Sequence, residues 1–428
     1  MRGEIIAIGD ELTSGRILNT TSRFAAARLF AAGHELIAMT TVGDDISLIS
    51  RTLILALERA DFVLVTGGLG STTDDLTNEA VAAALARPPI LYPEILRKIQ
   101  SHSRHLPQET RASLEKLAWL PTGAHALHTE ARCAGYFLVH QGKPVFFLPG
   151  VPHEMEELLV ETVLSRLAVW EGTAARQVRQ RLYRVAGLGE AAINQKLLPL
   201  EGRDPRVRIG YYPVFPEVHV SLTVYDGAED GAETLLAAAD REIAASLGDF
   251  IYGLGDETLA AAVGRLLTER GLSLAVAESC SGGLLAAEIT GVPGSSAYFA
   301  GGVVAYSNDL KERLLGVESA VLAAHGAVSA PVAARMADGL RRVSGAGLAL
   351  SVTGIAGPDG GSEEKPVGTV FMGLATEGGA WAFRYQFKGE RRQIQEITAH
   401  TALDLIRRHL LSLAYPEPPV YNDENFCP

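Results

Sequence analysis

One stretch organises the last third of the chain: residues 272–289, which are LSLAVAESCSGGLLAAEI. The apolar residues 272–277 have the length of a short buried strand, and residues 284–289 begin a helix pattern. The turn between them presents hydroxyls and two glycines to a helix N-terminus, where free amides favour an anion or a developing oxyanion. Small residues in such a turn can also serve packing alone, so the stretch by itself leaves both interpretations open.

The composition is that of a large, acidic, globular chain. Its 428 residues suggest roughly three domains, with 47% hydrophobic residues. The net charge of −12 argues against direct binding to nucleic acid or to an anionic membrane, because both require a basic surface. The cysteines, Cys133, Cys280 and Cys427, show no disulfide or zinc spacing. With no signal peptide or membrane-spanning pattern, we expect a cytoplasmic protein without a membrane partner.

Strand patterns alternate with helix patterns in the first segment, residues 1–170, which predicts an α/β fold with a mostly parallel, doubly wound sheet. The pattern runs through a strand at 5–8, a helix at 19–32, a strand at 34–41, a helix at 46–59 and a strand at 62–65. Ligands bind at the carboxyl ends of strands in such sheets. The acidic and glycine-rich clusters fall at those ends, at Asp10-Glu11, Asp44-Asp45 and the loop at 66–75.

The loop at 66–75, TGGLGSTTDD, is the strongest candidate site of this segment. Glycine loops that open a helix can cradle phosphates through backbone amides, and neighbouring carboxylates suggest a divalent metal that bridges to those phosphates. The loop is not a Walker motif, because no lysine follows the glycines. Helix capping is the alternative for any aspartate here, and we favour it for Asp44 and Asp45.

Three motifs of the first segment resemble the molybdopterin-binding-type domain that opens CinA proteins, the competence/damage-inducible family. They are GDEL at 9–12, TGGLG at 66–70 with the aspartates after it, and LPGVP at 148–152. The resemblance implies an ADP-ribose pyrophosphatase that uses a divalent metal such as Mg²⁺. Its implied substrate contacts are Gly67, Gly68 and Gly70, and its implied metal ligands are Asp10, Asp74, Asp75 and Glu154. This chain has Ser71 where the family usually has proline, which makes the loop slightly less rigid.

The middle segment, residues 171–253, has the pattern of a small α+β unit without a cluster of titratable residues. It resembles the KH-like domain of the same family. The acidic chain and the lack of a basic Gly-x-x-Gly loop argue against RNA binding, so we expect a spacer or a dimerisation element.

The last segment, residues 254–415, is predicted to be α/β with hydroxyls at several strand ends. No histidine adjoins a serine, so Lys311 is the natural base for a nucleophilic reaction. A lysine can act as a base only if burial or neighbouring positive charge lowers its pKa. Cys280 follows Ser279, and adjacent side chains in an extended strand point to opposite faces, so we expect Cys280 to be buried and inert.

The motifs of the last segment resemble the CinA carboxy-terminal domain, a nicotinamide-nucleotide amidohydrolase. They are AESCSGG at 277–283, GSS at 294–296, YSN at 306–308 with Lys311, and TGIAGP at 353–358. The resemblance implies a Ser/Lys amidase whose nucleophile is either Ser279 or Ser296. It further implies Lys311 as base, with Tyr306 relaying a proton or holding the carboxamide. The implied substrate-binding residues are Thr353, Gly354 and Arg391.

Together the resemblances imply a bifunctional enzyme of pyridine-nucleotide salvage. The last segment would deamidate nicotinamide mononucleotide to nicotinate mononucleotide and ammonia without a cofactor, and the first would hydrolyse ADP-ribose to AMP and ribose 5-phosphate. Small nucleotides are thus the expected ligands, and the family suggests a homodimer. In the alternative, the first domain is a pterin- or nucleotide-binding module without catalysis. The Pro- and acid-rich tail, residues 416–428, is predicted to be disordered.

Overall fold

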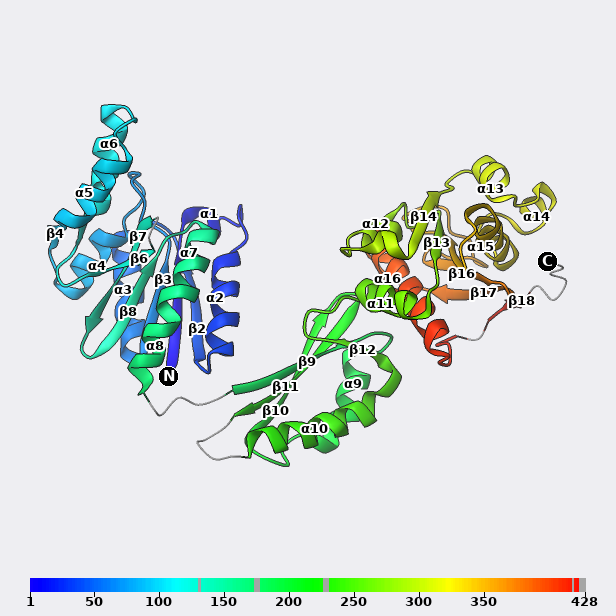
Figure 1. The fold of residues 1–428 in the computed structure, drawn as a ribbon, viewed down its shortest axis with the longest axis horizontal. Helices are drawn as coiled ribbons and strands as arrows, with labels where there is room; N and C mark the ends of the chain where they lie inside the picture. Colours follow the sequence, from blue (N-terminus) through cyan, green and yellow to red (C-terminus); the bar gives the residue numbers. More distant parts are fainter. Residues whose placement is uncertain (130–131, 173–177, 226–230, 418, 423–428) are drawn as a thin grey trace. The chain divides into compact units, whose positions relative to one another are not determined.

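A computed structural model describes residues 1–428 except 130–131, 173–177, 226–230, 418 and 423–428 (Figure 1). Contacts divide the chain into two compact units. The first unit comprises Met1–Arg179 and Val224–Glu233, and the second comprises Gln180–Thr223 and Thr234–Pro428. The division into 1–170, 171–253 and 254–415 stays a prediction. Across the residues that the structure describes, no helix combines the length and apolar character that crossing a bilayer requires.

A six-stranded sheet forms the centre of the first unit, in the order β2-β1-β3-β8-β7-β6. Neighbours from β2 to β8 pair in parallel, and β8, β7 and β6 pair antiparallel. The strands are β1 (Arg2–Ile8), β2 (Glu35–Val42), β3 (Phe62–Thr66), β6 (His125–Thr129), β7 (Arg132–His140) and β8 (Lys143–Leu148). The helices are α1 (Asp10–Thr13), α2 (Thr20–Ala31), α3 (Ile46–Arg59), α4 (Thr77–Leu85), α5 (Pro93–His102), α6 (Gln108–Glu115), α7 (Pro152–Leu158) and α8 (Leu164–Glu171). A short hairpin pairs β4 (Pro89–Leu91) with β5 (Trp119–Pro121).

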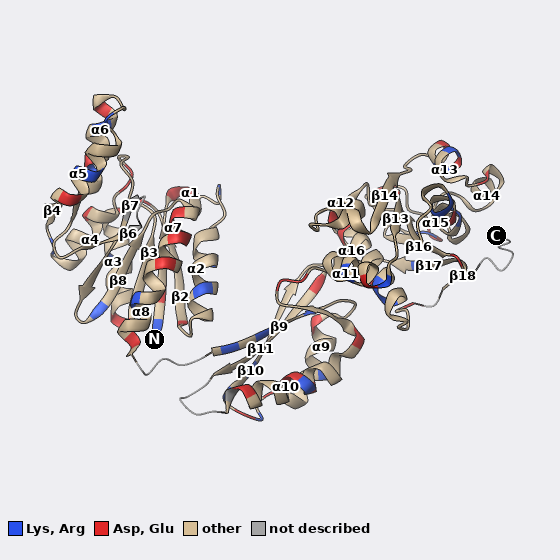
Figure 2. Ribbon diagram, viewed as in Figure 1, with Lys and Arg blue, Asp and Glu red and all other residues tan. Residues whose placement is uncertain are grey.

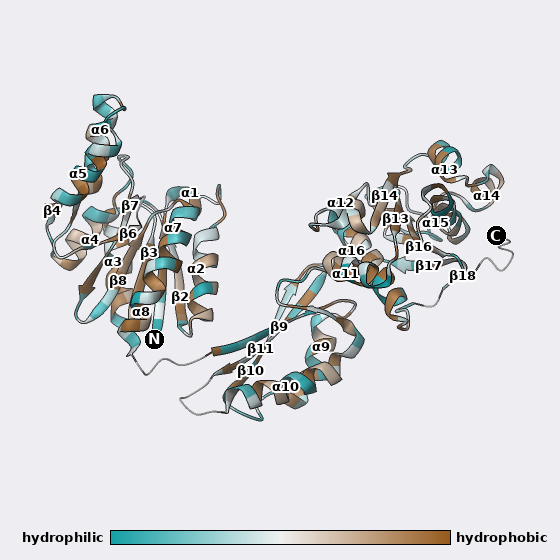
Figure 3. Cartoon of the chain, viewed as in Figure 1, coloured by the Kyte–Doolittle hydropathy of each residue, from teal (hydrophilic) through white to brown (hydrophobic). Residues whose placement is uncertain are grey.

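Helices cover both faces of this sheet, so the predicted doubly wound arrangement is confirmed. Consecutive strand residues point to opposite faces. Ile5 accordingly packs with Leu29 of α2, whereas Ile6 packs with Leu53 of α3. Figure 3 shows brown, apolar colouring along these strands and mixed colouring on the helices beside them. Burial on both faces explains why the strands are nearly continuous apolar runs.

The second unit contains two sheets. The first of these, formed by the middle of the chain, has the order β10-β11-β9-β12. Its elements are β9 (Val178–Val185), β10 (Val207–Val214), β11 (Glu217–Tyr225), β12 (Ile251–Leu254), α9 (Glu190–Leu197) and α10 (Ala232–Leu247). This is the small α+β arrangement that the sequence predicts, with α9, α10 and a four-stranded sheet among the residues described for this segment.

The other sheet of the second unit has the order β14-β13-β15-β16-β17-β18, with the first three strands parallel and the rest antiparallel. Its strands are β13 (Leu274–Glu278), β14 (Phe299–Val304), β15 (Leu348–Gly354), β16 (Thr369–Thr376), β17 (Gly379–Gln386) and β18 (Tyr421–Asn422). The helices are α11 (Leu259–Arg270), α12 (Leu284–Thr290), α13 (Asn308–Leu315), α14 (Ser319–His325), α15 (Ala330–Ser344) and α16 (Arg391–Leu411). Apolar clusters bury both faces, with α11, α12 and α16 on one face and α13 to α15 on the other.

The C-terminal tail differs from the prediction. Tyr421 and Asn422 form β18, which pairs with Trp381 and Ala382 of β17. The expectation of disorder over 416–428 is therefore wrong for these two residues, because an open edge of the sheet supplies backbone partners. Residues 418 and 423–428 lie outside the described residues.

Candidate active sites

Parallel pairing brings the ends of β13, β14 and β15 to one edge of the last sheet. Glu278 pairs with Val304 on one side and with Val352 on the other. The residues that follow these three strands are therefore neighbours, which places Ser279 between the segment that begins at Ala305 and Thr353. This edge carries most of the side chains that the sequence predicts for the amidase site.

Lys311 on α13 reaches into this edge and contacts Ser279. Its ammonium nitrogen Nζ donates to Ser279 Oγ at 3.1 Å, to the carbonyl oxygen of Ala305 at 2.8 Å and to that of Tyr306 at 3.2 Å. Lys311 is only 1% exposed, and this burial lowers the pKa of its amine. The arrangement is a serine hydroxyl beside an amine that loses its proton more readily than usual, which is what a Ser–Lys nucleophile requires.

The N-terminal amides of α12 are occupied from within the chain. The carboxylate of Glu278, 1% exposed, accepts hydrogen bonds from the amides of Gly283 at 3.0 Å, Leu285 at 3.1 Å and Ala286 at 2.8 Å. The expectation that the first turn offers free amides to an external anion is therefore wrong for these three groups. The anion favoured at this helix end is the side chain that directly precedes Ser279.

Cys280 is buried, as predicted, with 6% of its surface exposed. Burial raises the pKa of its thiol to about 12, so the thiol is neutral near pH 7 and is a poor nucleophile. Its carbonyl oxygen accepts a hydrogen bond from Gln395 Nε2 of α16 at 3.0 Å. Sequence reasoning missed Gln395, because no local pattern relates it to a loop 115 residues earlier.

Tyr306 and Arg391 lie together at the same edge. Arg391 donates from Nη2 to the hydroxyl oxygen of Tyr306 at 3.1 Å and from Nη1 to the carbonyl of Gly357 at 2.7 Å. Tyr306 is 59% exposed, so both side chains are accessible to a ligand. An exposed arginine held by one carbonyl retains donors for an anionic group.

Thr353 and Gly354 are both packed closely against neighbouring backbone. Thr353 is 1% exposed, and its hydroxyl donates to the carbonyl of Ala327 at 2.8 Å. The hydroxyl proton therefore already has an acceptor within the protein. A Cβ atom at Gly354 would lie 2.8 Å from the carbonyl oxygen of Thr369, so a side chain there would collide with β16. Both residues shape the edge beside Ser279, and their contact with substrate stays a prediction.

Ser296 lies far from Ser279 in the structure. It is an exposed residue of the turn that precedes β14, and Phe299 at the start of β14 pairs with Leu274 at the start of β13. Ser279, in contrast, follows the end of β13. The five residue steps along β14 correspond to about 16 Å, so the two serines lie at opposite edges of the sheet. The structure thus brings Lys311 to Ser279 and not to Ser296.

The first unit contains a pocket of about 560 Å³ at the carboxyl ends of its parallel strands. Figure 2 shows acidic residues on α1 and α7, the helices that begin at this end of the sheet. Six of the seven residues predicted for the pyrophosphatase site line the pocket, namely Gly67, Gly68, Gly70, Asp74, Asp75 and Glu154. Further lining residues that the sequence analysis did not assign to a site include Glu11, Asp44, Lys98 and His102.

Gly67 shows why the pocket floor needs glycine. Its φ is +97°, and a Cβ atom there would lie 2.2 Å from the carbonyl oxygen of Ile8. Thr77, fully buried, donates its hydroxyl to the carbonyl of Gly67 at 2.9 Å and fixes the turn. Glycine is therefore required here by the positive φ and by the close approach of this turn to the end of β1.

Asp10 and Asp44 are linked by two hydrogen bonds, and Asp44 does not cap α3. The backbone amide of Asp10 donates to Asp44 Oδ2 at 2.9 Å, and the backbone amide of Asp44 donates to Asp10 Oδ1 at 3.1 Å. Asp44 lines the pocket, and Asp10 is absent from its described lining. Burial raises the pKa of Asp44, and the charges of Asp10, Glu11 and Asp74 add to this effect. Asp45 does cap α3, accepting from the amide of Leu48 at 2.7 Å.

The acidic side of the pocket does not form a ready-made metal cage. Among the described residues, no group of three His, Cys, Asp or Glu side chains is arranged to hold a metal ion alone. Asp75 accepts a hydrogen bond from the amide of Thr72 at 2.8 Å, which turns one of its oxygens toward its own loop. Mg²⁺ needs only one or two carboxylates when substrate phosphates complete its shell. Asp74 and Glu154 line the pocket, and both their role as ligands and the metal itself stay predictions.

Three family models match consecutive parts of the chain. A "Probable molybdopterin binding domain" matches residues 4–169, a "Damage-inducible protein CinA KH domain" matches 180–253, and a "CinA C-terminal domain" matches 256–410.

Similar proteins and structures carry related names. A "CinA-like protein" of Desulfotalea psychrophila is 50% identical over 408 residues, which cover 95% of this chain and 98% of that protein. A "Putative competence-damage inducible protein" of Moorella thermoacetica is 41% identical over 416 residues, covering 96% and 99%. Among solved structures, competence/damage inducible protein CihA of Agrobacterium tumefaciens is 41% identical with a TM-score of 0.35, covering 36% of this chain and 93% of that one. Because the relatives from Desulfotalea psychrophila and Moorella thermoacetica are 50% and 41% identical over nearly their whole length, the chain belongs to the CinA family of competence/damage-inducible proteins.

Proposed function

We propose that the second unit hydrolyses the carboxamide of nicotinamide mononucleotide, giving nicotinate mononucleotide and ammonia. The observation that carries this proposal is the contact between Lys311 Nζ and Ser279 Oγ at 3.1 Å, with the lysine buried. A Ser–Lys pair suits acyl chemistry on an amide, because the lysine can both take the serine proton and return it to the leaving nitrogen.

The steps follow from the geometry around Ser279. Neutral Lys311 takes the hydroxyl proton as Oγ bonds to the carboxamide carbon, and the carbonyl π electrons move to oxygen. Collapse of this intermediate breaks the C–N bond, and the ammonium of Lys311 protonates the departing nitrogen to give ammonia. Water then hydrolyses the acyl-serine ester to the carboxylate and frees Ser279. The carbonyls of Ala305 and Tyr306, at 2.8 and 3.2 Å, hold the charged form of Lys311 between these transfers.

Arg391 supports a nucleotide as the substrate. It is exposed, and its contact with Tyr306 places a permanent positive charge beside the reacting edge. A 5′-phosphate would pair with this guanidinium, which distinguishes a nucleotide from free nicotinamide. Arg391→Gln should therefore raise the KM for the mononucleotide more than it lowers kcat.

Ammonia release from nicotinamide mononucleotide tests the amidase. Ser279→Ala should abolish release, whereas Cys280→Ala should retain it, because the buried thiol does not attack. Ser296→Ala decides the alternative nucleophile. A Ser296→Ala loss equal to that of Ser279→Ala, with Ser279 still unacylated in a trapped intermediate, would contradict the assignment.

For the first unit, the activity proposed is hydrolysis of ADP-ribose to AMP and ribose 5-phosphate. The pocket at the strand ends supports it, since the glycines of this loop and several carboxylates line the same pocket. Asp74 and Glu154 would hold a divalent ion that neutralises the diphosphate. The glycine turn would bind phosphate oxygens through its amides.

Metal-dependent AMP formation from ADP-ribose tests this second activity. Asp74→Asn combined with Glu154→Gln should abolish AMP formation and leave ammonia release intact. Asp45→Asn is the matched control, because Asp45 caps α3 and is not among the described pocket residues. ADP-ribose that binds to the wild-type protein without forming AMP would instead support a binding module. Light scattering of the full chain tests the homodimer expected from the family.

A further inference from the structure

Helix α16 connects the Ser279 edge to the middle sheet of the same unit. Its first turns hold the proposed active site, since Arg391 contacts Tyr306 and Gln395 contacts the carbonyl of Cys280 at 3.0 Å. Its next turns contact the segment formed by residues 180–253. One helix thus touches both parts of the second unit, which gives the middle segment a mechanical connection to Ser279.

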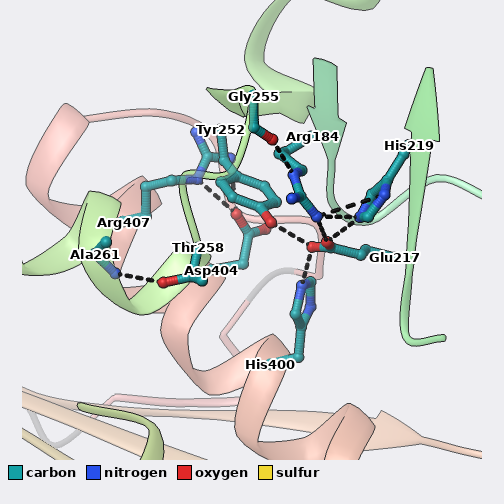
Figure 4. Close-up of polar contacts among 10 residues, drawn as sticks. All are labelled: Arg184, Glu217, His219, Tyr252, Gly255, Thr258, Ala261, His400, Asp404 and Arg407. Atoms are coloured by element: carbon teal, nitrogen blue, oxygen red, sulfur yellow. Dashed lines mark hydrogen bonds and ion pairs between the residues drawn. The ribbon is translucent and has the colours of Figure 1, made fainter. Parts of the chain in front are cut away.

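Glu217, at the start of β11, is the centre of that contact (Figure 4). His400 of α16 places Nε2 3.0 Å from Glu217 Oε2, and Tyr252 of β12 donates its hydroxyl to the same oxygen. On the other side, His219 Nε2 lies 2.6 Å from Glu217 Oε1. Arg184 Nη1 forms an ion pair with the same oxygen of Glu217 at 3.3 Å. The side chains of Glu217 and His400 are only 10% and 13% exposed, so the contact is largely shielded from water.

Glu217 remains ionised in this environment. Burial would raise its pKa, but the hydrogen bonds from His400, Tyr252 and His219 outweigh burial and hold the pKa at about 2. A second contact lies further along the helix, where Arg407 donates to the carbonyl of Asp249 at 2.8 Å. The middle segment therefore holds α16 at two successive positions through buried polar groups.

A helix transmits such a constraint because its backbone is stiff. His400 follows Gln395 by five residues and Arg391 by nine, which correspond to about 7.5 and 13.5 Å along the axis. Most residues between Ile394 and Leu410 are buried, so the helix can shift only as a packed body. A change at His400 therefore changes the position of Gln395 and Arg391 relative to Ser279 and Tyr306.

We propose that Glu217 and His400 are positioning residues for the amidase site, and that the middle segment supports this site through α16. The inference rests on the proposed amidase. It assigns the segment 180–253 a role in the chemistry of the other sheet, rather than that of a spacer. Neither residue touches the reacting atoms. Their effect passes through Gln395, which holds the loop after Ser279, and through Arg391, which holds Tyr306.

Kinetics of His400→Ala in the full chain test the proposal. We expect the KM for nicotinamide mononucleotide to rise about tenfold with kcat changed less than threefold, because coupling through packed elements has this size. His400→Gln should restore most of the lost affinity, since its amide can still donate to Glu217. His409→Ala is the control, because His409 lies on the same helix but contacts Tyr415 at 2.9 Å. A folded His400→Ala protein with the KM of the wild type would overturn the proposal.

Hydrogen exchange provides a readout that does not depend on the amidase. In His400→Ala, the amides of residues 279–283 and 391–395 should exchange faster while global unfolding is unchanged. If the wild type releases no ammonia, the proposed amidase function fails. Hydrogen exchange still tests whether the middle segment is connected through α16 to the loop after Ser279. Tyr252→Phe is the milder variant if His400→Ala does not fold, and it should show the same exchange pattern. Exchange at 279–283 equal to that of the wild type would refute the connection.

Discussion

Lys311→Met is the sharpest test of the Ser279–Lys311 pair. Methionine fills a similar volume but has no N–H groups, so Ser279 loses its base, and the carbonyls of Ala305 and Tyr306 lose a donor. A general base contributes about 10²–10⁴ in rate, which at 1.36 kcal/mol per decade is about 3–5 kcal/mol of transition-state stabilisation. We expect kcat/KM for ammonia release to fall by this factor while AMP formation from ADP-ribose is unchanged.

The pH profile separates a base from a structural cation. Burial lowers the pKa of Lys311, so the wild-type kcat/KM should rise with pH and reach its plateau below 10.5, the ordinary value for lysine. The residual rate of Lys311→Met should lack this rise. Lys311→Arg keeps the charge but cannot lose its proton near neutral pH, and it should be as inactive as Lys311→Met. An active Lys311→Arg protein would show that the charge, and not proton transfer, is required.

The double variant tests whether the two residues act as one unit. Groups that act together are strongly non-additive, so Ser279→Ala with Lys311→Met should be no slower than Ser279→Ala alone. Ammonia release would be followed in a coupled assay, with thermal unfolding to confirm that each variant folds. Losses that multiply, or a Lys311→Met rate within tenfold of the wild type, would refute the pair.

Glu278→Gln should lower the free energy of unfolding of the second unit by roughly 2–3 kcal/mol, measured by urea unfolding, because the amides at the start of α12 lose a charged acceptor. Glu288→Gln, within α12, is the control. Gly67→Ala should weaken ADP-ribose binding, measured by calorimetry, and destabilise more than Gly142→Ala, because both have positive φ but only Gly67 meets a backbone oxygen. Glu217 has a folded pKa of about 2, below its ordinary 4.5, so its stabilising contribution is complete above pH 4.5 and is lost as pH falls toward 2. Acid unfolding of Glu217→Gln should lack this component.

The sequence predicts the folds and the general location of both candidate sites. Apolar runs followed by glycine-rich turns predict the strand-to-helix connections at Ser279 and at Gly67. Parallel topology then predicts that such turns gather at one sheet edge, as Thr353 and Ser279 do. The order of helices and strands in the sequence also predicts that Ser296 lies away from Ser279. It lies between a helix and the next strand, and such connections fall at the amino edge of a parallel sheet.

Other features depend on side-chain geometry that no local pattern encodes. Asp44 and Asp45 are adjacent and equally suited to capping, yet only Asp44 turns into the pocket, because the amide of Asp10 holds its carboxylate. Gln395 and His400 belong to a helix whose sequence shows no functional motif. Gln395 contacts the carbonyl of Cys280 and His400 contacts Glu217 only once the chain has folded, so the sequence alone does not reveal either contact.

The neighbours of Ser279 explain how Lys311 can act as a base in a chain of net charge −12. A free carboxylate beside the amine would stabilise its charged form and raise its pKa. Glu278 is the nearest acid in sequence, but three amides of α12 bind its charge. Cys280 is a neutral thiol, because burial raises its pKa to about 12. Desolvation is therefore the larger effect on Lys311, and it lowers the pKa of the amine against the smaller, opposing interaction with Cys280.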